Sequence, residues 1–259
     1  MLDAELQAAA AAWKRAGRVG WWVELVAVRG SVPRGVGAAM LVDAAEVLGS
    51  IGGGHLEWQA LRLAREGQLG EHRFALGPSL GQCCGGSVRL RIRSLTEWQP
   101  APPASLTPPR FQLELYGAGH VGRAIVRLLA DIPCRVRWID ARLDEPFPAV
   151  PVHVQTLHSE GAEPCPNGAH VRVMTHRHDL DLAIIESLLR EDRCASLGVI
   201  GSASKAASFR QRLAHLGLDA AALHCPTGLP GIRGKEPAVI AVAVVAELLQ
   251  LAQAASAKR

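Results

Sequence analysis

The sequence predicts an α/β protein in two parts, a mixed α+β domain followed by an open parallel sheet with helices. Residues 99–110 contain five prolines, which fix φ and remove backbone donors, so this stretch favours an extended linker. Before it, short strand-like runs predominate; after it, strands and helices alternate. We therefore expect a first domain at residues 1–98, a linker at 99–110 and a second domain at 111–259.

The composition is that of an ordinary globular protein. Hydrophobic residues make up 49% of the chain and charged residues 20%, which is enough apolar material for a core. The formal net charge of +4 is too small to indicate binding to nucleic acid, whereas small anionic ligands are compatible with it. Six cysteines in 259 residues do not suggest a disulfide framework, so we expect reduced thiols.

Both ends of the sequence favour a cytoplasmic protein without a membrane segment. Asp3 and Glu5 stand where a signal peptide carries positive charge. The apolar run Ala238–Ala246 is followed by Glu247 and then Gln250. These polar residues favour a buried terminal helix over a transmembrane span.

The first domain begins with a predicted helix and continues mainly as short strands. The elements that we expect are helices at 3–16 and 55–66, a turn at 30–35, and strands at 21–28, 38–42, 47–51, 72–76 and 87–93. The last strand alternates strictly, with apolar residues on one face and Arg89, Arg91 and Arg93 on the other. Such a stripe is commonly a solvated face, and contact with an anionic group is the alternative.

The second domain alternates between strands and helices. We expect strands at 111–116, 135–139, 152–154, 170–174 and 196–200, and helices at 121–130, 180–190, 203–215 and 237–252. This order predicts an open parallel sheet, because parallel neighbours need crossover connections that are usually helical.

A GxGxxG motif lies between the first strand and the first helix of this second domain. Gly117 permits the tight turn, Gly119 lets the backbone approach a pyrophosphate, and Gly122 allows close helix–strand packing. Asp140 ends the next strand, 23 residues after Gly117, where an acid can bind the ribose of a dinucleotide. The pattern predicts a Rossmann-like fold and makes NAD(P) a candidate ligand. Arg142 either contacts a 2′-phosphate or is a solvated surface residue.

Three consecutive glycines, Gly52, Gly53 and Gly54, precede the predicted helix at 55–66. Their backbone N–H groups can form a nest for an anion, or they can simply provide a strand-to-helix turn that needs glycine. His55 and Glu57 follow at the start of the helix, from which both side chains can reach a bound group.

Two adjacent thiols, Cys83 and Cys84, precede Gly85 and Gly86. A redox dithiol is normally CxxC, since a bridge between adjacent cysteines is strained. Two interpretations stay open. The cysteines form a buried structural pair, or a soft thiolate ligates a metal while the glycines let the ligand come close.

Polar segments follow two later strands. Residues 176–181 contain two histidines and two aspartates, and a polar group at the carboxyl edge of the sheet is favoured there over a metal site. His176 and Asp181 are the candidate residues, with a helix cap as the alternative for Asp181. Ser202 and Lys205 lie in a second turn suited to phosphate, although the spacing is not that of a Walker A loop.

Together these motifs resemble the xanthine dehydrogenase accessory factor family, the XdhC/CoxI group, over nearly the whole chain. In the first domain the resemblance rests on GSxPR at 30–34, GSIGGG at 49–54 with Glu57, and CGG at 84–86. In the second it rests on GAGHVG at 117–122, DxR at 140–142, Thr175-His176 with Asp181, IGS at 200–202 with Lys205, and CPTGL at 225–229. The chain departs from the family pattern at PGIRG, residues 230–234, and at Ala238-Val239, where the family has acidic residues.

The resemblance implies an accessory protein rather than an enzyme. Members bind the molybdenum cofactor, a molybdopterin that carries molybdenum on a dithiolene. They support its sulfuration by a cysteine desulfurase and deliver it into xanthine dehydrogenase or a related molybdenum hydroxylase. Cys84 is then the candidate metal ligand. The candidate cofactor-binding residues of both domains are Ser31, Arg34, Gly52, Gly53, Gly54, His55, Glu57, Cys83, Cys84, Gly85, Gly86, Gly117, Gly119, His120, Gly122, Asp140, Arg142, His176, Asp181, Ser202 and Lys205.

Two other classes of function stay open. An NAD(P)-dependent oxidoreductase would use the GxGxxG motif and Asp140, although no Lys–Tyr or His–acid catalytic pair accompanies them. A regulatory or scaffold protein would use the same domain to sense a nucleotide. A homodimer is a further hypothesis, since two facing surfaces would shield a cofactor from water and oxygen.

Overall fold

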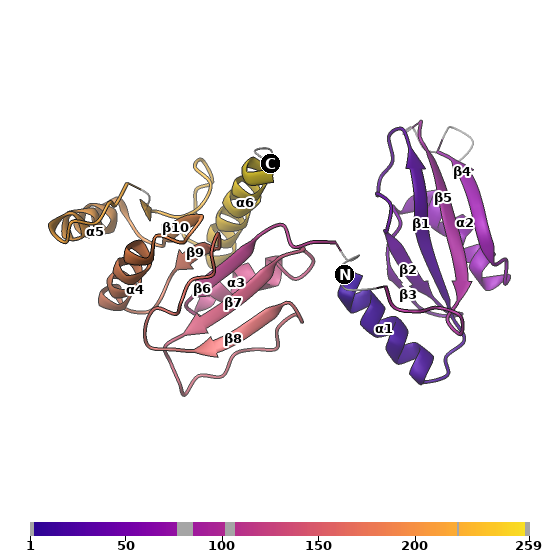
Figure 1. The fold of residues 1–259 in the computed structure, drawn as a ribbon, viewed down its shortest axis with the longest axis horizontal. Coiled ribbons are helices and arrows are strands. Elements are labelled where there is room, and N and C mark those ends of the chain that lie inside the picture. Colours follow the sequence, from indigo (N-terminus) through magenta and orange to yellow (C-terminus); the bar gives the residue numbers. More distant parts are fainter. Residues whose placement is uncertain (1–2, 77–84, 102–106, 222, 257–259) are drawn as a thin grey trace. The chain divides into compact units, whose positions relative to one another are not determined.

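The computed structural model describes residues 3–76, 85–101, 107–221 and 223–256. The chain divides into two compact units, Met1–Thr107 and Pro108–Arg259 (Figure 1). Each unit has its own sheet, antiparallel in the first and parallel in the second. The predicted α/β fold class, a mixed α+β part followed by a Rossmann-like parallel sheet, is confirmed. The division falls within the proline-rich stretch expected to be a linker.

The first unit is a five-stranded sheet in the order β3-β2-β1-β5-β4. Its elements are α1 (Asp3–Arg15), β1 (Trp21–Arg29), β2 (Ala39–Val42), β3 (Val47–Gly49), α2 (Gly54–Arg65), β4 (Gly70–Ala75) and β5 (Ser87–Ser94). β1 and β5 are paired over most of their length, with a bulge between Leu25 and Ala27 of β1. The bulge keeps the alternation of inward and outward residues on β5 intact while β1 gains one residue.

The two helices of this unit bury opposite faces of the sheet. α2 covers a core that includes Val23 and Leu25 of β1 and Leu90 and Ile92 of β5. On the other face, α1 packs through Leu6, Ala10 and Trp13 against a second cluster that contains Trp22, Leu95 and Trp98. The strict alternation along β5 thus separates core residues from the arginine stripe, as period two requires.

The second unit is a six-stranded parallel sheet in the order β11-β10-β9-β6-β7-β8. The strands are β6 (Gln112–Tyr116), β7 (Arg135–Asp140), β8 (Val154–His158), β9 (His170–Val173), β10 (Ser196–Val199) and β11 (Leu223–His224). The chain proceeds from β6 to β7 and β8 on one side, and then returns to β9 on the other. The pair β6–β9 is therefore the point at which such sheets bind ligands at their carboxyl edge.

Four helices complete three layers in this unit. They are α3 (His120–Leu128), α4 (His178–Glu191), α5 (Ala203–His215) and α6 (Pro237–Ser256). α3 and α6 share one core with β6 and β7, and α4 and α5 share another with β9 and β10. One predicted strand was misplaced: the segment expected at 152–154 is β8, Val154–His158, whose exposed edge position gives it little apolar signal. The two-residue β11 was not predicted.

In the part of the chain that the structure describes, α6 alone is long and apolar enough to cross a membrane, with a mean hydropathy of 1.9 over Pro237–Ala255. Its residues Ala241, Val244 and Leu248 are nevertheless buried in the core that it shares with α3. Glu247 of the same helix forms an ion pair inside the unit. These contacts show that one face of the helix packs on the core of this unit.

Candidate functional site

Two of the first-unit motifs meet at one end of the antiparallel sheet. β1 ends at Arg29 and β5 begins at Ser87, and these two residues are paired in the ladder. Just beyond them, Ser31 and Gly85 form an isolated parallel bridge. A Cβ atom at Gly86 would lie 2.2 Å from the Ser31 carbonyl oxygen, so this close approach requires glycine. The turn after β1 therefore packs directly on Gly85 and Gly86.

The same turn also contacts the triple-glycine segment. Gly52 has a φ of 130°, and a Cβ atom there would come within 2.8 Å of Pro33 Cγ. Ser31 and Arg34 are both exposed on this turn. Three segments that are distant in sequence thus form one surface, which we call the turn cluster: residues 30–34, 52–54, 85 and 86.

Open space lies over part of the turn cluster. Gly53 and Gly85 both have left-handed φ values, 78° and 66°. No atom of the described residues lies within 4 Å of where a Cβ would stand at either position, apart from the immediate chain neighbours. These two glycines therefore present backbone that a ligand can approach closely.

The N–H groups of the triple-glycine segment already hold an anion, which is the chain's own Glu57. A single oxygen, Oε1, accepts the N–H groups of Ile51 at 2.9 Å, Gly52 at 3.2 Å and Gly53 at 2.8 Å, and the Ser50 hydroxyl at 2.6 Å. The glycines form a nest, and its anion is internal. An external anion at these N–H groups, one of the two sequence interpretations, would have to displace this carboxylate.

Glu57 and His55 have different surroundings although they start the same helix. Burial acts to raise the pKa of Glu57, but the hydrogen bonds from Ser50 and the backbone N–H groups outweigh it and lower that pKa. The charged carboxylate therefore fixes the turn to α2. His55 is exposed, with Nε2 at 3.0 Å from Gln59 Nε2 and its ring 5.2 Å from that of Trp58.

Cys83 and Cys84 lie outside the described residues, so both interpretations of the thiol pair stay predictions. The residues that flank this segment are placed. The Leu76 N–H donates to the Gly86 carbonyl at 2.7 Å, and the Gly85 N–H donates to the Leu76 carbonyl at 2.9 Å. Leu76 is therefore hydrogen-bonded to Gly85 and Gly86 at the edge of the sheet that holds the turn cluster.

In the second unit, the GxGxxG loop lies beside the end of β9. Gly117 has a φ of 112°, and a Cβ atom there would lie 2.3 Å from the Met174 carbonyl oxygen. A Cβ atom at Gly122 would lie 2.1 Å from the Gly117 carbonyl oxygen, so both glycines serve packing. Gly119, the N-cap of α3, has no described atom within 4 Å of a Cβ position, and His120 beside it is exposed. The N-terminus of α3 is thus open to a ligand.

Asp140, the last residue of β7, holds this glycine loop in place by hydrogen bonds. Its carboxylate accepts the Ala118 N–H, the Arg142 N–H at 2.9 Å, and two guanidinium bonds from Arg142 at 2.9 and 3.0 Å. Burial acts to raise the pKa of Asp140, but Arg142 and the backbone N–H groups lower it on balance. Arg142 also pairs with Glu145 at 2.6 Å. Both side chains thus have partners within the loop. A ribose ligand for Asp140 and a 2′-phosphate for Arg142 stay predictions.

Asp181 joins two loops at the same edge of the sheet. It is fully buried, accepts the Thr175 N–H at 2.9 Å and hydroxyl at 2.7 Å, and pairs with Lys205 Nζ at 2.6 Å. Lys205 Nζ also donates to the Ile200 carbonyl at 2.9 Å. The two charges compensate each other, so the pair ties the loop after β9 to the turn after β10.

Ser202 and His176 are the exposed candidates at this edge. Ser202 is the N-cap of α5, where its Oγ accepts the Lys205 N–H at 3.3 Å. His176 is exposed in the loop after β9. Within the described ranges, no group of three His, Cys, Asp or Glu side chains is placed to hold a metal ion. These residues therefore line a polar edge.

A buried ionic network was missed by sequence reasoning. Arg172 of β9 is 0% exposed, and its Nη2 lies 2.8 Å from Glu247 Oε2 of α6. Glu247 also accepts hydrogen bonds from Thr227 Oγ1 and the Gly228 N–H, each at 3.1 Å, and lies 3.0 Å from His224 Nδ1. The available signals were single charges inside an apolar strand and an apolar helix, which need partners when buried.

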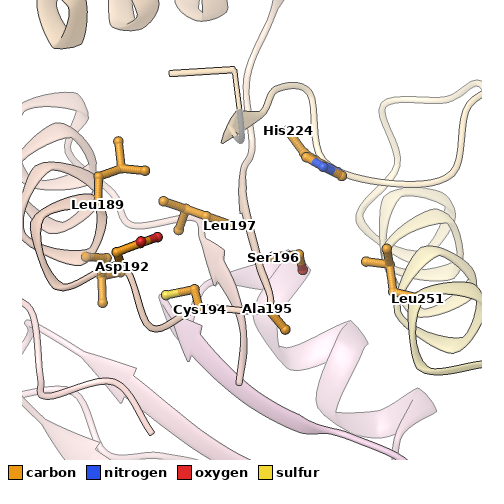
Figure 2. A pocket seen from close by; sticks show the side chains of 9 residues that line it. Leu189, Asp192, Cys194, Ala195, Ser196, Leu197, His224 and Leu251 are labelled. Carbon is orange, nitrogen blue, oxygen red and sulfur yellow. The ribbon is translucent and has the colours of Figure 1, made fainter. Parts of the chain in front are cut away.

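A cavity of about 190 Å³ lies near this network, toward the amino end of β10 (Figure 2). None of the predicted site residues lines it. Ligands of parallel α/β sheets bind at the opposite, carboxyl edge. Its lining residues are Leu188, Leu189, Asp192, Cys194, Ala195, Ser196, Leu197, His224 and Leu251.

Comparison with known proteins matches both units. Residues 13–76 match the XdhC and CoxI family, and residues 113–248 match the XdhC Rossmann domain. The crystal structure of a xanthine dehydrogenase from Bacillus halodurans superposes with a TM-score of 0.74 and 20% identity, over 98% of this chain and 96% of that one. At that identity the likeness shows a shared fold.

A curated relative from Escherichia coli K12 is the uncharacterized protein YqeB. It is 29% identical over 245 residues, which cover 88% of this chain but 42% of YqeB, so the chain spans less than half of that relative. The family matches cover the second unit almost completely and most of the first. The chain therefore belongs to the XdhC/CoxI accessory factor family.

Proposed function

We propose that this protein binds the molybdenum cofactor at the turn cluster of its first unit and delivers it to xanthine dehydrogenase or a related molybdenum hydroxylase. Membership of the accessory factor family supports a role in maturing a molybdenum enzyme. The observation that carries the proposal is the meeting of residues 30–34 with the glycines at 52–54, 85 and 86, beside the segment that bears the cysteines.

The residues of the turn cluster fit a soft, anionic and transiently held group. Gly53 and Gly85 leave open space over the backbone, which a side chain would fill. Arg34 is exposed and contributes a positive charge. Cys84 directly precedes Gly85 in the sequence, and a thiolate is the protein ligand suited to a soft metal–sulfur centre.

Each residue has a defined task in this proposal. Arg34 and the Ser31 hydroxyl bind and orient the anionic and polar edges of the cofactor, and the Cys84 thiolate faces the metal. Glu57 is a positioning residue, because its carboxylate holds the Gly52–Gly53 turn in place. When bound, the cofactor supplies the molybdenum centre that the hydroxylase uses. The open turn cluster also leaves the held cofactor accessible to a cysteine desulfurase for sulfuration.

A delivery assay tests the proposal. Cofactor-loaded protein is mixed anaerobically with a cofactor-free molybdenum hydroxylase, and hydroxylase activity is compared with that given by an equal amount of free cofactor. We expect Arg34→Ala to lower the activation about fivefold or more, since it removes a charge-assisted contact. Arg15→Ala, an exposed arginine at the end of α1, is the matched control. Activation no better than with free cofactor would overturn the delivery role.

A nucleotide site in the second unit is the second candidate, favoured by the open N-terminus of α3 at Gly119. Helix N-termini at the carboxyl edge of such sheets bind phosphates. Reduction of NAD(P) by the purified protein with a substrate would support the oxidoreductase hypothesis. Nucleotide binding without turnover would instead support a sensing role.

A further inference from the structure

A pocket of about 470 Å³ lies on β1, β4 and β5 of the first unit, at the sheet end that holds the turn cluster. Its floor consists of three small side chains, Ala27, Ala75 and Ser87. Ser87 is paired with Ala75 on one side and with Arg29 on the other. Since Val88 and Leu90 belong to the core under α2, Ser87 lies on the opposite face of the sheet, where a concavity is open to ligands.

Three arginines from three different strands surround this floor. They are Arg29 of β1, Arg73 of β4 and Arg89 of β5. Arg73 and Arg89 stand directly opposite each other in the ladder. Like charges in that position destabilise a sheet. Among the described residues of this face only Glu71 lies near the pair, and Arg91 also pairs with it, whereas an anion between the two guanidinium groups would make the pair favourable.

The other arginines of the same face are compensated by acids. Arg91 lies 2.5 Å from Glu71, and Arg93 lies 2.8 Å from Glu24. These two pairs make that half of the arginine stripe an ordinary solvated ion-pair ladder, which is the interpretation first favoured by the sequence.

The three pocket arginines have weaker compensation, since among the described residues they have only a share of Glu71. Arg89 Nε lies 3.3 Å from Glu71, which Arg91 also uses, and this buried nitrogen makes no hydrogen bond. Arg73 interacts with Glu71 only at longer range, and Arg29 forms no ion pair with any described residue. The pocket therefore holds excess positive charge and an unsatisfied donor.

This donor set matches a phosphate ester. Guanidinium groups bind phosphate oxygens through paired N–H donors, and the Ser87 hydroxyl adds a further donor from the floor. The pocket volume exceeds that of a bare phosphate group, which leaves room for the molecule that carries it. Its few charges in a concave site suit a small molecule rather than the extended backbone of a nucleic acid.

We propose that Arg29, Arg73 and Arg89 bind the phosphate of a small phosphorylated ligand, and that this ligand is the same cofactor, since molybdopterin is a phosphate monoester. The identity of the ligand rests on the proposed function; the phosphate site does not. Arg29 directly precedes the turn at 30–34, and Ser87 directly follows Gly86. One end of a bound molecule in the pocket therefore adjoins the turn cluster.

Two binding measurements on the full chain test this site. Inorganic pyrophosphate is titrated by calorimetry, and retained molybdenum and pterin are quantified after anaerobic incubation with the cofactor and gel filtration. The pocket variant is Arg29→Ala with Arg73→Ala, both exposed residues. The control, Arg91→Ala with Arg93→Ala, removes equal charge from the same face outside the pocket. Circular dichroism verifies that both variants are folded.

We expect the pocket variant to bind pyrophosphate and cofactor at least about tenfold more weakly, and the control to stay within about twofold of wild type. Pyrophosphate binding and cofactor retention that are both equal in wild type and pocket variant would overturn the phosphate site and leave the cofactor-carrier function standing. Equal cofactor retention with weakened pyrophosphate binding would keep the phosphate site and overturn the cofactor as its ligand. Pyrophosphate binding through the pocket without cofactor retention would support the phosphate site, assign it to another ester and overturn the carrier function. Binding of neither probe by wild type would overturn both.

Discussion

Removing the Glu57 carboxylate is expected to destabilise the first unit. Glu57→Ala leaves three backbone N–H groups and the Ser50 hydroxyl without their acceptor, and one of these N–H groups belongs to the fully buried Ile51. A hydrogen bond to a charged group contributes about 1.5–3 kcal/mol, but water can reach the half-buried Gly52 and Gly53 and replace part of this. We therefore expect a loss of about 3 kcal/mol for Glu57→Ala, and about 1–2 kcal/mol for Glu57→Gln, whose amide oxygen still accepts.

Urea unfolding followed by tryptophan fluorescence measures this loss of stability in the first unit of the chain. Of the six tryptophans, all but Trp138 lie in the first unit. Glu66→Gln is the control, because Glu66 follows the same helix, is exposed and makes only a surface pair with Arg62 at 3.7 Å. Such pairs contribute about 0–1 kcal/mol. A Glu57→Ala protein as stable as Glu66→Gln would refute the idea that this carboxylate holds the turn.

The lowered pKa of Glu57 also makes the stability difference between wild type and Glu57→Gln depend on pH. The folded-state pKa of Glu57 lies below its ordinary value of 4.5, so the unfolded chain takes up the proton first on acidification. The stabilisation is therefore present above pH 4.5 and is lost as the pH falls through the folded-state pKa. Unfolding curves of wild type and Glu57→Gln should converge in acid. A difference that persists unchanged would contradict a charge-based role.

Three further predictions concern the second unit. Glu247→Gln leaves the buried Arg172 uncompensated and should lower its stability by about 3–5 kcal/mol, measured by thermal unfolding; an unchanged midpoint would contradict this. Burial and the nearby Arg172 lower the pKa of His170 to about 4 from 6.5. The unfolded state therefore binds the proton first, and stability should fall by up to roughly 3 kcal/mol between pH 6.5 and 4 in wild type but not to that extent in His170→Gln. Gly117→Ala should unfold the loop, whereas Gly119→Ala should keep wild-type stability and lose any nucleotide binding seen by titration.

The periodic spacing of apolar residues predicted most of the fold. The alternation along residues 87–93 and the alternating strands and helices after residue 111 place elements close to where the structure has them. The failures are edge strands. β8 has mostly polar or exposed residues, and β11 pairs over only two residues, so neither has the apolar run that a buried strand requires.

The contacts of the candidate residues could not be predicted in the same way. Motif position makes Glu57, Asp140 and Asp181 candidate ligand-binding acids, with a helix cap as the alternative for Asp181. In the structure each is engaged by groups of its own chain. Those partners depend on how loops that are distant in sequence pack together and on side-chain rotamers. The spacing of residues within a motif predicts neither.

The arginine stripe shows the same limit. The sequence places three arginines on one face of a strand, but their ion-pair partners differ because of residues on neighbouring strands. Glu71 of β4 and Glu24 of β1 compensate Arg91 and Arg93. The pairing register, which the sequence does not reveal, thus decides which arginines of the face stay available to a ligand.

The most direct test of the account is whether the chain itself retains the molybdenum cofactor. Purified protein is incubated with the cofactor under anaerobic conditions, and molybdenum and pterin that co-elute in gel filtration are quantified for wild type and Cys84→Ala. The account predicts near-stoichiometric retention of both by wild type and a clear loss in the variant. Absence of co-eluting molybdenum and pterin from the wild-type protein would contradict it.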